Sequence, residues 1–208
     1  REAWLKQLQS QINPHFLYNC LFFIKNMARL GDEEAVVAMT LNLGEYFRYT
    51  TRLGKQTARL QEELDVLVNY LEIQNLRTNR IQYRMEVSAS LHDQEIPRLI
   101  LQPVVENAVI HGIEPKEGQG HIWIRGFEEE HGFRIVIEDD GIGMDSADIQ
   151  NLQSRVERGE NPDNASYGLW NVHQRMKLMF GGDSGLTLAS GEGGGTIVVM
   201  RGARCFGS

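Results

Sequence analysis

The spacing of apolar residues changes about halfway along the chain, and this change limits the folds that the chain can adopt. In the first part, apolar residues recur every three or four positions, as they do on one face of an α-helix. In the second part, runs that alternate between apolar and polar residues indicate half-buried strands, with helical stretches between them. The sequence therefore predicts an α+β fold with a helical part followed by an α/β part.

The N-terminal part predicts a helical hairpin. A helical pattern covers residues 1–10, and a second apolar series (Phe16, Cys20, Phe23, Met27, Leu30) follows Asn13-Pro14. Asn13 is then the N-cap and Pro14 the first helical residue, or Pro14 kinks one continuous helix, and both alternatives stay open.

Gly31-Asp32 breaks this pattern, and a further helix carries a narrow stripe (Val36, Met39, Leu43, Tyr46, Leu53). A hairpin of this size has too small a core to be stable alone. We therefore expect it to pair with a second copy as a four-helix bundle in a homodimer.

A third helix is predicted from Leu60, with Glu62 and Glu63 in the first turn, where the helix dipole favours acids. We place a domain boundary near residue 56, which gives domains 1–56 and 57–208. The second domain is predicted to contain strands at 81–87, 121–127, 133–138, 186–189 and 196–200, helices at 98–111 and 169–180, and a mobile loop at 145–166.

Residues 139–144 read DDGIGM and follow a predicted strand. Because Gly141 and Gly143 have no Cβ atoms, the backbone can turn sharply there and approach a flat ligand closely. The carboxylate of Asp139 is suited to accept a hydrogen bond from an exocyclic amine. A plain Asp-Gly turn has the same sequence, so this segment alone leaves both interpretations open.

Polar residues interrupt the apolar segment LQPVVENAVIHG at 101–112. On a helix, Asn107 and His111 lie four residues apart on one face, with Glu106 beside them. The carbonyl oxygen of Asn107 suits Mg²⁺, which takes few protein ligands when it also binds phosphate oxygens. A solvent-facing polar strip is the alternative, but these residues are a costly choice in so apolar a helix if nothing uses them.

Two glycine-containing segments further along the chain suit a phosphate-bearing ligand. Gly168 is predicted to open a helix whose free N–H groups and positive dipole end favour phosphate oxygens. His173 or Arg175 on the same helix can add positive charge. Thr196 begins the last strand after three glycines, where its hydroxyl can reach a ligand.

In this order, the segments resemble the N, G1 and G2 boxes of the Bergerat ATP-binding fold, which histidine kinases share with gyrase and the heat-shock chaperones. The resemblance covers about residues 57–208 and implies an α/β sandwich that binds ATP and Mg²⁺. It implies that Asn107 binds Mg²⁺, that Asp139 accepts the adenine amine and that Thr196 lies beside Asp139. The nucleotide contacts expected from the motifs and the resemblance are Asn107, His111, Asp139, Gly141, Gly143, Met144, Gly168, Leu169, Arg175 and Thr196.

The segment LQSQINPHFLYNCLFFI at 8–24 is similar to the histidine box of the LytS/YehU-type sensor kinases, and EYFRYT and YLEIQNLR further on are also similar to that group. The resemblance implies that His15 accepts a phosphoryl group and passes it to an aspartate of a response regulator. A neutral imidazole is nucleophilic at pH 7. Its place beside Phe16 predicts that His15 faces solvent. Asn19 is expected to orient the imidazole, and Glu106 is a candidate proton acceptor.

Four positions depart from the commoner pattern of histidine kinases. Phe16 stands where many have an acid, and Pro103 stands where the N box has a second Asn. Asp140 and Ser166 stand where Asn and Gly are frequent. These departures leave open a signalling scaffold that has lost turnover. An ATPase, which shares the nucleotide site but does not need His15, is a second open alternative.

Composition excludes several other classes. A net charge of -7 provides no basic surface for nucleic acid. The two cysteines, Cys20 and Cys205, have no spacing typical of a zinc site or a disulfide framework. No apolar run approaches the roughly 20 residues that cross a bilayer. The resemblance implies the cytoplasmic portion of a bacterial inner-membrane receptor, attached to the membrane through segments outside this sequence.

Overall fold

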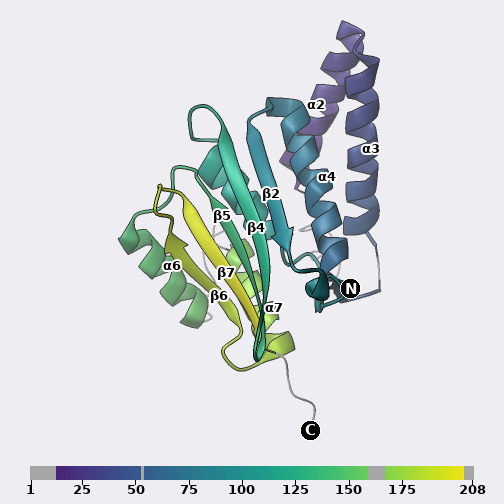
Figure 1. Ribbon diagram of the computed structural model, residues 1–208. Coiled ribbons are helices and arrows are strands. Elements are labelled where there is room, and N and C mark those ends of the chain that lie inside the picture. Colours follow the sequence, from purple (N-terminus) through teal and green to yellow (C-terminus); the bar gives the residue numbers. More distant parts are fainter. Residues whose placement is uncertain (1–12, 53, 159–166, 204–208) are drawn as a thin grey trace. The chain divides into compact units, whose positions relative to one another are not determined.

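The computed structural model describes residues 13–52, 54–158 and 167–203 (Figure 1). Two compact units emerge from its contacts. The helical unit comprises the chain up to Lys55 together with Leu64–Asn79, and the α/β unit comprises Gln56–Glu63 and the chain from Arg80 onward. Because helix α4 (Leu60–Thr78) contributes to both units, the domain boundary near residue 56 stays a prediction.

Helix α2 (Pro14–Leu30) begins as one of the two alternatives predicted. Asn13 is its N-cap, and Oδ1 of Asn13 accepts hydrogen bonds from the N–H groups of His15 at 3.1 Å and Phe16 at 3.4 Å. Pro14, which has no N–H to lose, is the first helical residue. The helical pattern predicted for residues 1–10 lies outside the described residues.

The break predicted at Gly31-Asp32 is confirmed. Gly31 adopts a left-handed conformation with φ of 75° and ends α2, as glycine commonly does after a helix. Asp32 then caps helix α3 (Glu33–Thr50), because its Oδ1 accepts a hydrogen bond from the N–H of Ala35 at 3.0 Å. The two helices pack against each other as a hairpin.

Aromatic rings fill the centre of the helical unit. The ring centroid of Phe16 lies 5.2 Å from that of Tyr46 and 5.5 Å from that of Tyr70 on α4. Cys20 is fully buried beside them, and burial raises the pKa of its thiol to about 11. The predicted stripe of α2 is buried only at its start, since Leu30 remains 76% exposed.

A five-stranded sheet forms the framework of the α/β unit. Its strand order is β2-β4-β5-β7-β6; β2 runs parallel to β4, and the other neighbours are antiparallel. The strands are β2 (Ile81–Val87), β4 (Gly120–Glu129), β5 (Gly132–Asp139), β6 (Gly185–Ser190) and β7 (Thr196–Ala203). All five were predicted, β2 with the same ends and the other four with slightly different ends.

Helices cover the apolar face of this sheet. Helix α7 (Tyr167–Phe180) packs on β6 and β7, and α6 (Ser146–Arg158) packs on β6 (Figure 1). Helix α5 (Gln102–Asn107) packs on α7 and continues as the π-helical segment η2 (Ala108–Ile113). Side chains that alternate along the strands are buried beneath them: Ile122, Ile124, Phe133, Ile135, Ile137, Val198 and Met200.

The structure corrects two expectations. The helix expected from residue 98 begins at Gln102, because residues 98–101 form a turn after the short strand β3 (Glu95–Pro97). Most of the loop predicted at 145–166 is helix α6, while 159–166 lies outside the described residues. Oδ1 of Asp145 accepts from the N–H of Asp148 at 2.8 Å at the start of α6, and Ile149 and Val156 are buried.

Short elements that the sequence did not predict complete the unit. Strand β1 (Thr57–Arg59) pairs antiparallel with β3, and the 3-10 segment η1 (Ala89–Leu91) follows β2. None of the helices described in residues 13–203 is both long and apolar enough to cross a membrane.

Candidate functional site

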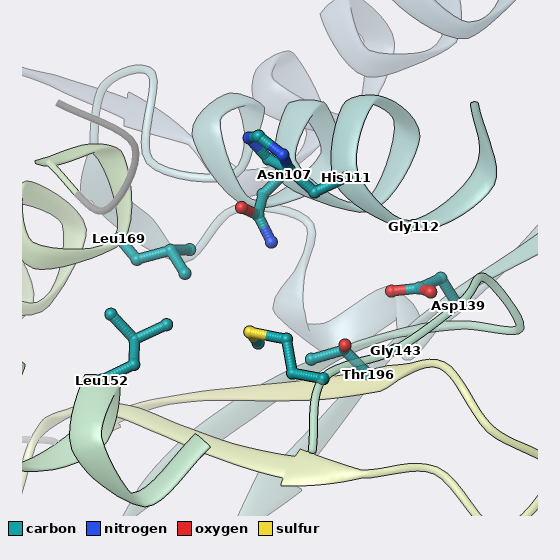
Figure 2. Close-up of a pocket in the computed structure, with 9 residues that line it drawn as sticks. Asn107, His111, Gly112, Asp139, Gly143, Leu152, Leu169 and Thr196 are labelled. Atoms are coloured by element: carbon teal, nitrogen blue, oxygen red, sulfur yellow. The ribbon is translucent and has the colours of Figure 1, made fainter. Parts of the chain in front are cut away.

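A cavity of about 220 Å³ lies in the α/β unit, between η2, the loop after β5, the start of β7 and helices α6 and α7. Figure 2 shows Asn107 and His111 on the helical segment along one side, Asp139 and Thr196 at one end, and Leu152 and Leu169 at the other. The residues that line it are Asn107, His111, Gly112, Asp139, Gly143, Met144, Leu152, Leu169 and Thr196. Seven of these nine lining residues are among the predicted nucleotide contacts.

Asp139 is a buried acid at the end of β5, and its side chain is only 5% exposed. Burial raises the pKa of its carboxyl to about 6, although hydrogen bonds from the backbone N–H groups of Gly141 and Thr196 oppose this shift. The N–H of Gly141 donates to Oδ1 at 2.9 Å. The carboxyl group points into the cavity (Figure 2) and offers an acceptor for a ligand amine in apolar surroundings.

Glycines allow the loop after β5 to pack against η2 backbone to backbone. A Cβ on Gly141 would collide with the backbone of Gly112, and the N–H of Ile142 donates to the carbonyl oxygen of Gly112 at 3.0 Å. Gly143, with φ of 69°, lines the cavity, whereas Gly141 does not. The absence of a side chain at Gly141 therefore serves the packing of the cavity wall.

Asn107 and His111 face the cavity from the junction of α5 and η2. In the π-helical segment the backbone makes wider turns than in an α-helix, a feature often found at functional sites. Mg²⁺ suits a site in which one or two protein oxygens join water and phosphate oxygens. The carbonyl oxygen of Asn107 fits that requirement, and the described residues contain no cluster of three or more His, Cys, Asp or Glu side chains that would favour another metal.

Glu106 borders a second cavity of about 130 Å³, which shares Asn107, His111 and Leu169 with the first. The Oε1 atom of Glu106 accepts a hydrogen bond from Nε2 of Gln102 at 2.9 Å. Burial raises the pKa of the Glu106 carboxyl, and this hydrogen bond only partly opposes the shift. A carboxyl group of this kind is better suited to accept a proton near neutral pH than an exposed one.

Asp140, which stands where Asn is frequent, anchors the loop after β5. Its Oδ1 accepts from the backbone N–H of His121 at 2.6 Å, and its Oδ2 lies 2.7 Å from Nδ1 of His121 and 3.2 Å from Nζ of Lys116. Partial burial acts to raise the pKa of Asp140, but the hydrogen bonds and charge of its partners outweigh it, so the pKa is lowered. The carboxylate joins the loop to β4 and to the segment after η2.

Helix α7 places its predicted residues differently. Leu169 lines both cavities and Gly168 lines the second, as expected for the helix start. Arg175 lies outside the lining of both cavities, since its guanidinium donates to the carbonyl oxygen of Arg98. His173 is buried, and its Nδ1 accepts from the N–H of Leu186 at 3.0 Å. The structure therefore places neither Arg175 nor His173 in the lining of these two cavities.

His15 lies on the first turn of α2, in the helical unit. It is exposed, while the neighbouring Phe16 is buried, as their places on the helix predicted. The Nδ2 atom of Asn19 lies 3.3 Å from Nδ1 of His15. Asn19 thus contacts one ring nitrogen of the imidazole from one turn away.

Comparisons with known proteins relate both units to one family. Residues 3–81 match the family model described as "Histidine kinase". Residues 92–202 match the model described as "Histidine kinase-, DNA gyrase B-, and HSP90-like ATPase". The chain belongs to the histidine kinases. The second match confirms the resemblance on which the nucleotide site was predicted.

Curated relatives of this histidine kinase align over nearly all of it. It is 33% identical over 201 residues to the sensor histidine kinase YesM of Bacillus subtilis, which covers 96% of this chain and 33% of YesM. It is 37% identical over 184 residues to the sensor histidine kinase YpdA of Escherichia coli, which covers 86% of this chain and 31% of YpdA. The chain thus spans about a third of the length of these relatives.

Solved structures share the fold of this histidine kinase. The histidine kinase domain of a blue-light activated kinase from Erythrobacter litoralis has a TM-score of 0.50 at 17% identity, covering 96% of this chain and 90% of that domain. The catalytic domain of histidine kinase ThkA has a TM-score of 0.52 at 16% identity, covering 73% of this chain and 97% of that domain. These likenesses confirm the predicted α+β class and show the fold alone.

Two cavity residues of this histidine kinase were missed by the sequence analysis. Gly112 lines the cavity and lies so close to Asp139 that a Cβ there would be 2.7 Å from Oδ1 of the carboxylate. The HG pair that ends the predicted helix was a signal for this close approach. Leu152 lies on α6, where the sequence predicts a loop and gives no signal for a contact.

Proposed function

We propose that this chain uses ATP to phosphorylate His15 and then passes the phosphoryl group to an aspartate of a response regulator. The observation that carries this proposal is the presence, in one chain, of an exposed His15 and of a cavity lined by Asp139 and Asn107. The matches to histidine kinase family models and to relatives named sensor histidine kinases support it. An ATPase alone would need only the cavity.

Asp139 and Thr196 would hold the adenine at one end of the cavity, and Leu169 would contact phosphate at the other. Asn107 would be the protein ligand of Mg²⁺, and the lining residues His111 and Met144 would border the nucleotide. Magnesium would neutralise charge that develops on the phosphate oxygens. Because Asp139 is buried, a base without an exocyclic amine would leave its carboxylate without a hydrogen-bond donor, which is energetically unfavourable. The site should therefore prefer a base that carries such an amine.

In the transfer step, a bond forms between the γ-phosphorus and a ring nitrogen of His15, and the bond to the leaving ADP oxygen breaks with its electron pair. The Nδ2 atom of Asn19 lies 3.3 Å from Nδ1 of His15, so its N–H group is placed to donate to Nδ1 and to orient the ring. The nucleophile is the ring nitrogen whose lone pair faces the γ-phosphorus. Glu106, whose carboxyl has a raised pKa, is the proposed acceptor of the proton released from the phosphorylated ring.

A homodimer is also part of this proposal. Large apolar side chains on α2 and α3 are exposed, including Tyr18 (72%), Phe22 (61%) and Leu41 (66%). Pairing two hairpins into a four-helix bundle would bury them. Since relatives that are named sensors extend well beyond the matched region, we place this chain in the cytoplasmic portion of a bacterial membrane receptor.

Incubation with γ-labelled ATP and Mg²⁺ tests the proposal. We expect label that remains on the protein in alkali, leaves in acid and is absent from the variant His15→Gln, because a phosphoramidate is labile in acid. The variant should still bind ATP, since His15 is outside the lining residues of the cavity. Phosphate release that continues in His15→Gln without labelling would indicate an ATPase, and ATP binding without either reaction would indicate a scaffold.

A further inference from the structure

A buried carboxylate in the first turn of α4 lies outside the lining of the cavity. Glu63 is 0% exposed, and its oxygens accept hydrogen bonds from the N–H groups of Leu99 at 2.8 Å and Ile100 at 3.1 Å. Burial of a carboxylate is unfavourable unless hydrogen bonds and opposite charge compensate for the lost hydration. The two backbone N–H groups from one turn therefore compensate in part for the burial of Glu63.

The turn that Glu63 holds leads directly into the helix that carries Asn107. Residues 98–101 connect β3 to α5, and Leu99 has a left-handed φ of 55°. For a residue with a side chain, this conformation is sterically unfavourable. The hydrogen bonds to Glu63 offset this cost and fix Leu99 and Ile100, which lie just before Leu101, the N-cap of α5. The position of this turn therefore bears on where α5 begins and where Asn107 lies.

Arg175 reaches the same turn from α7. Its guanidinium donates to the carbonyl oxygen of Arg98. Burial lowers the pKa of Arg175, and the nearby negative charge of Glu63 partly opposes this shift. Leu169, which lines the cavity, lies on the same helix as Arg175. The turn is thus hydrogen-bonded by Glu63 on α4 and by Arg175 on α7, and it connects α7 to the start of α5.

We propose that Glu63 and Arg175 are positioning residues for nucleotide binding. Together they hold the turn 98–101 and so set Asn107 on α5 and Leu169 on α7 at the separation that a nucleotide requires. This inference rests on the proposed function, because it assumes that the cavity binds ATP. It gives Arg175 an indirect role in place of the direct phosphate contact expected from the sequence.

Two substitutions with matched controls test the pair. Glu63→Gln retains the size of the side chain but removes the charge and replaces one acceptor by a donor that faces an N–H group. Arg175→Met removes the guanidinium. The controls Glu62→Gln and Lys177→Met change charge equally on the same two helices. Glu62 accepts from the N–H of Arg59 at the start of α4, and Lys177 is exposed.

We expect the dissociation constant of a fluorescent ATP analogue to rise roughly tenfold or more in Glu63→Gln and in Arg175→Met, since misplacement by about 1 Å can cost that much. The controls should stay within about twofold of the parent protein. The double variant should bind little more weakly than either single variant, because both act through one turn. Arg175→Lys, which retains the charge, should lose only part of the affinity and guards against loss of folding.

Amide hydrogen exchange without nucleotide provides a second readout. Segments 98–107 and 167–175 should exchange faster in Glu63→Gln and Arg175→Met than in the parent and the controls. If the parent fails to bind the ATP analogue, the proposed function fails, while exchange still reports whether the pair holds the turn. Unchanged exchange and affinity in Glu63→Gln would overturn the inference, and a loss of affinity in Arg175→Met alone would indicate a direct phosphate contact.

Discussion

Gly112 and Asp139 approach each other so closely that a Cβ on Gly112 would lie 2.7 Å from Oδ1 of the carboxylate. The end of η2 is therefore in tight contact with Asp139, the residue that we propose accepts the adenine amine. Since the carbonyl oxygen of Gly112 also accepts from the N–H of Ile142, the two walls of the cavity share one contact region. A change at Gly112 should act on the ligand acceptor directly.

Gly112→Ala should weaken ATP binding by roughly tenfold, because the added methyl group displaces the Asp139 carboxylate or the loop. Titration of a fluorescent ATP analogue measures the effect. Gly193→Ala is the matched control, since a Cβ on Gly193 meets nothing within 4 Å. Equal affinities in the two variants would contradict this account of Gly112.

Asp139→Asn should raise stability while it weakens ATP binding. Because burial raises the pKa of Asp139 from 3.8 to about 6, the folded state binds this proton more tightly than the unfolded state. The contribution of this proton to the free energy of unfolding is fully present below pH 3.8 and is lost as the pH rises through about 6. Urea unfolding between pH 5 and 8 should therefore show the variant more stable above pH 6, by up to about 3 kcal/mol, with a difference that shrinks in acid.

The same titration predicts that the parent protein binds ATP less tightly as the pH falls below about 6, because protonation of Asp139 removes the charged acceptor. Calorimetric titrations at pH 5.5 and 7.5 measure this difference. A ratio of affinities that Asp139→Asn leaves unchanged would show that another group is responsible.

Asp140→Ala should weaken ATP binding several-fold, because the loop after β5 loses its bonds to His121 and Lys116. Asp140→Asn should have a smaller effect, since an amide oxygen can still accept from the backbone of His121. Glu138→Ala removes an acid from the same strand end, one that pairs with Arg125 instead, and should leave ATP affinity unchanged. If Asp140→Ala matches Glu138→Ala, the carboxylate does not anchor the loop.

Asn19→Ala should slow the labelling of His15 by roughly tenfold or more, because the imidazole loses the contact that orients its ring. Affinity for ATP should not change, since Asn19 is outside the lining of the cavity. Asn19→Gln, which retains the amide, should restore labelling toward the parent rate. Single-turnover labelling with γ-labelled ATP compares the three proteins, and a parent-like rate in Asn19→Ala would remove Asn19 from the mechanism.

The local signals in the sequence were sufficient for much of the fold. Alternation along β4 and β5 and the stop at Gly31-Asp32 depend on neighbours in the chain, so their elements were predicted. Helix α6 was missed because its apolar stripe is narrow: Ile149, Leu152 and Val156 are its apolar members after the first turn, and the sheet supplies the rest of its stability. Strands β1 and β3, three residues each, are stabilised mainly by pairing with each other.

The site shows the same division. Asn107, His111, Asp139 and Thr196 were found because their spacing and their glycine neighbours express the chemistry locally. Arg175 reaches the carbonyl oxygen of Arg98 and not the cavity lining, and a helical pattern does not tell which neighbour a long side chain will reach. Neither did any local pattern show that Glu63 would accept two bonds from a turn more than thirty residues away.

The buried thiol of Cys20 can report how often the helical unit opens. Only the thiolate of Cys20 reacts readily, and burial both shields the sulfur and raises its pKa to about 11. Alkylation at neutral pH must therefore wait for transient separation of the helices. The rate at which mass spectrometry detects a modified Cys20 peptide thus measures how often the segment that carries His15 comes apart, without any inserted probe.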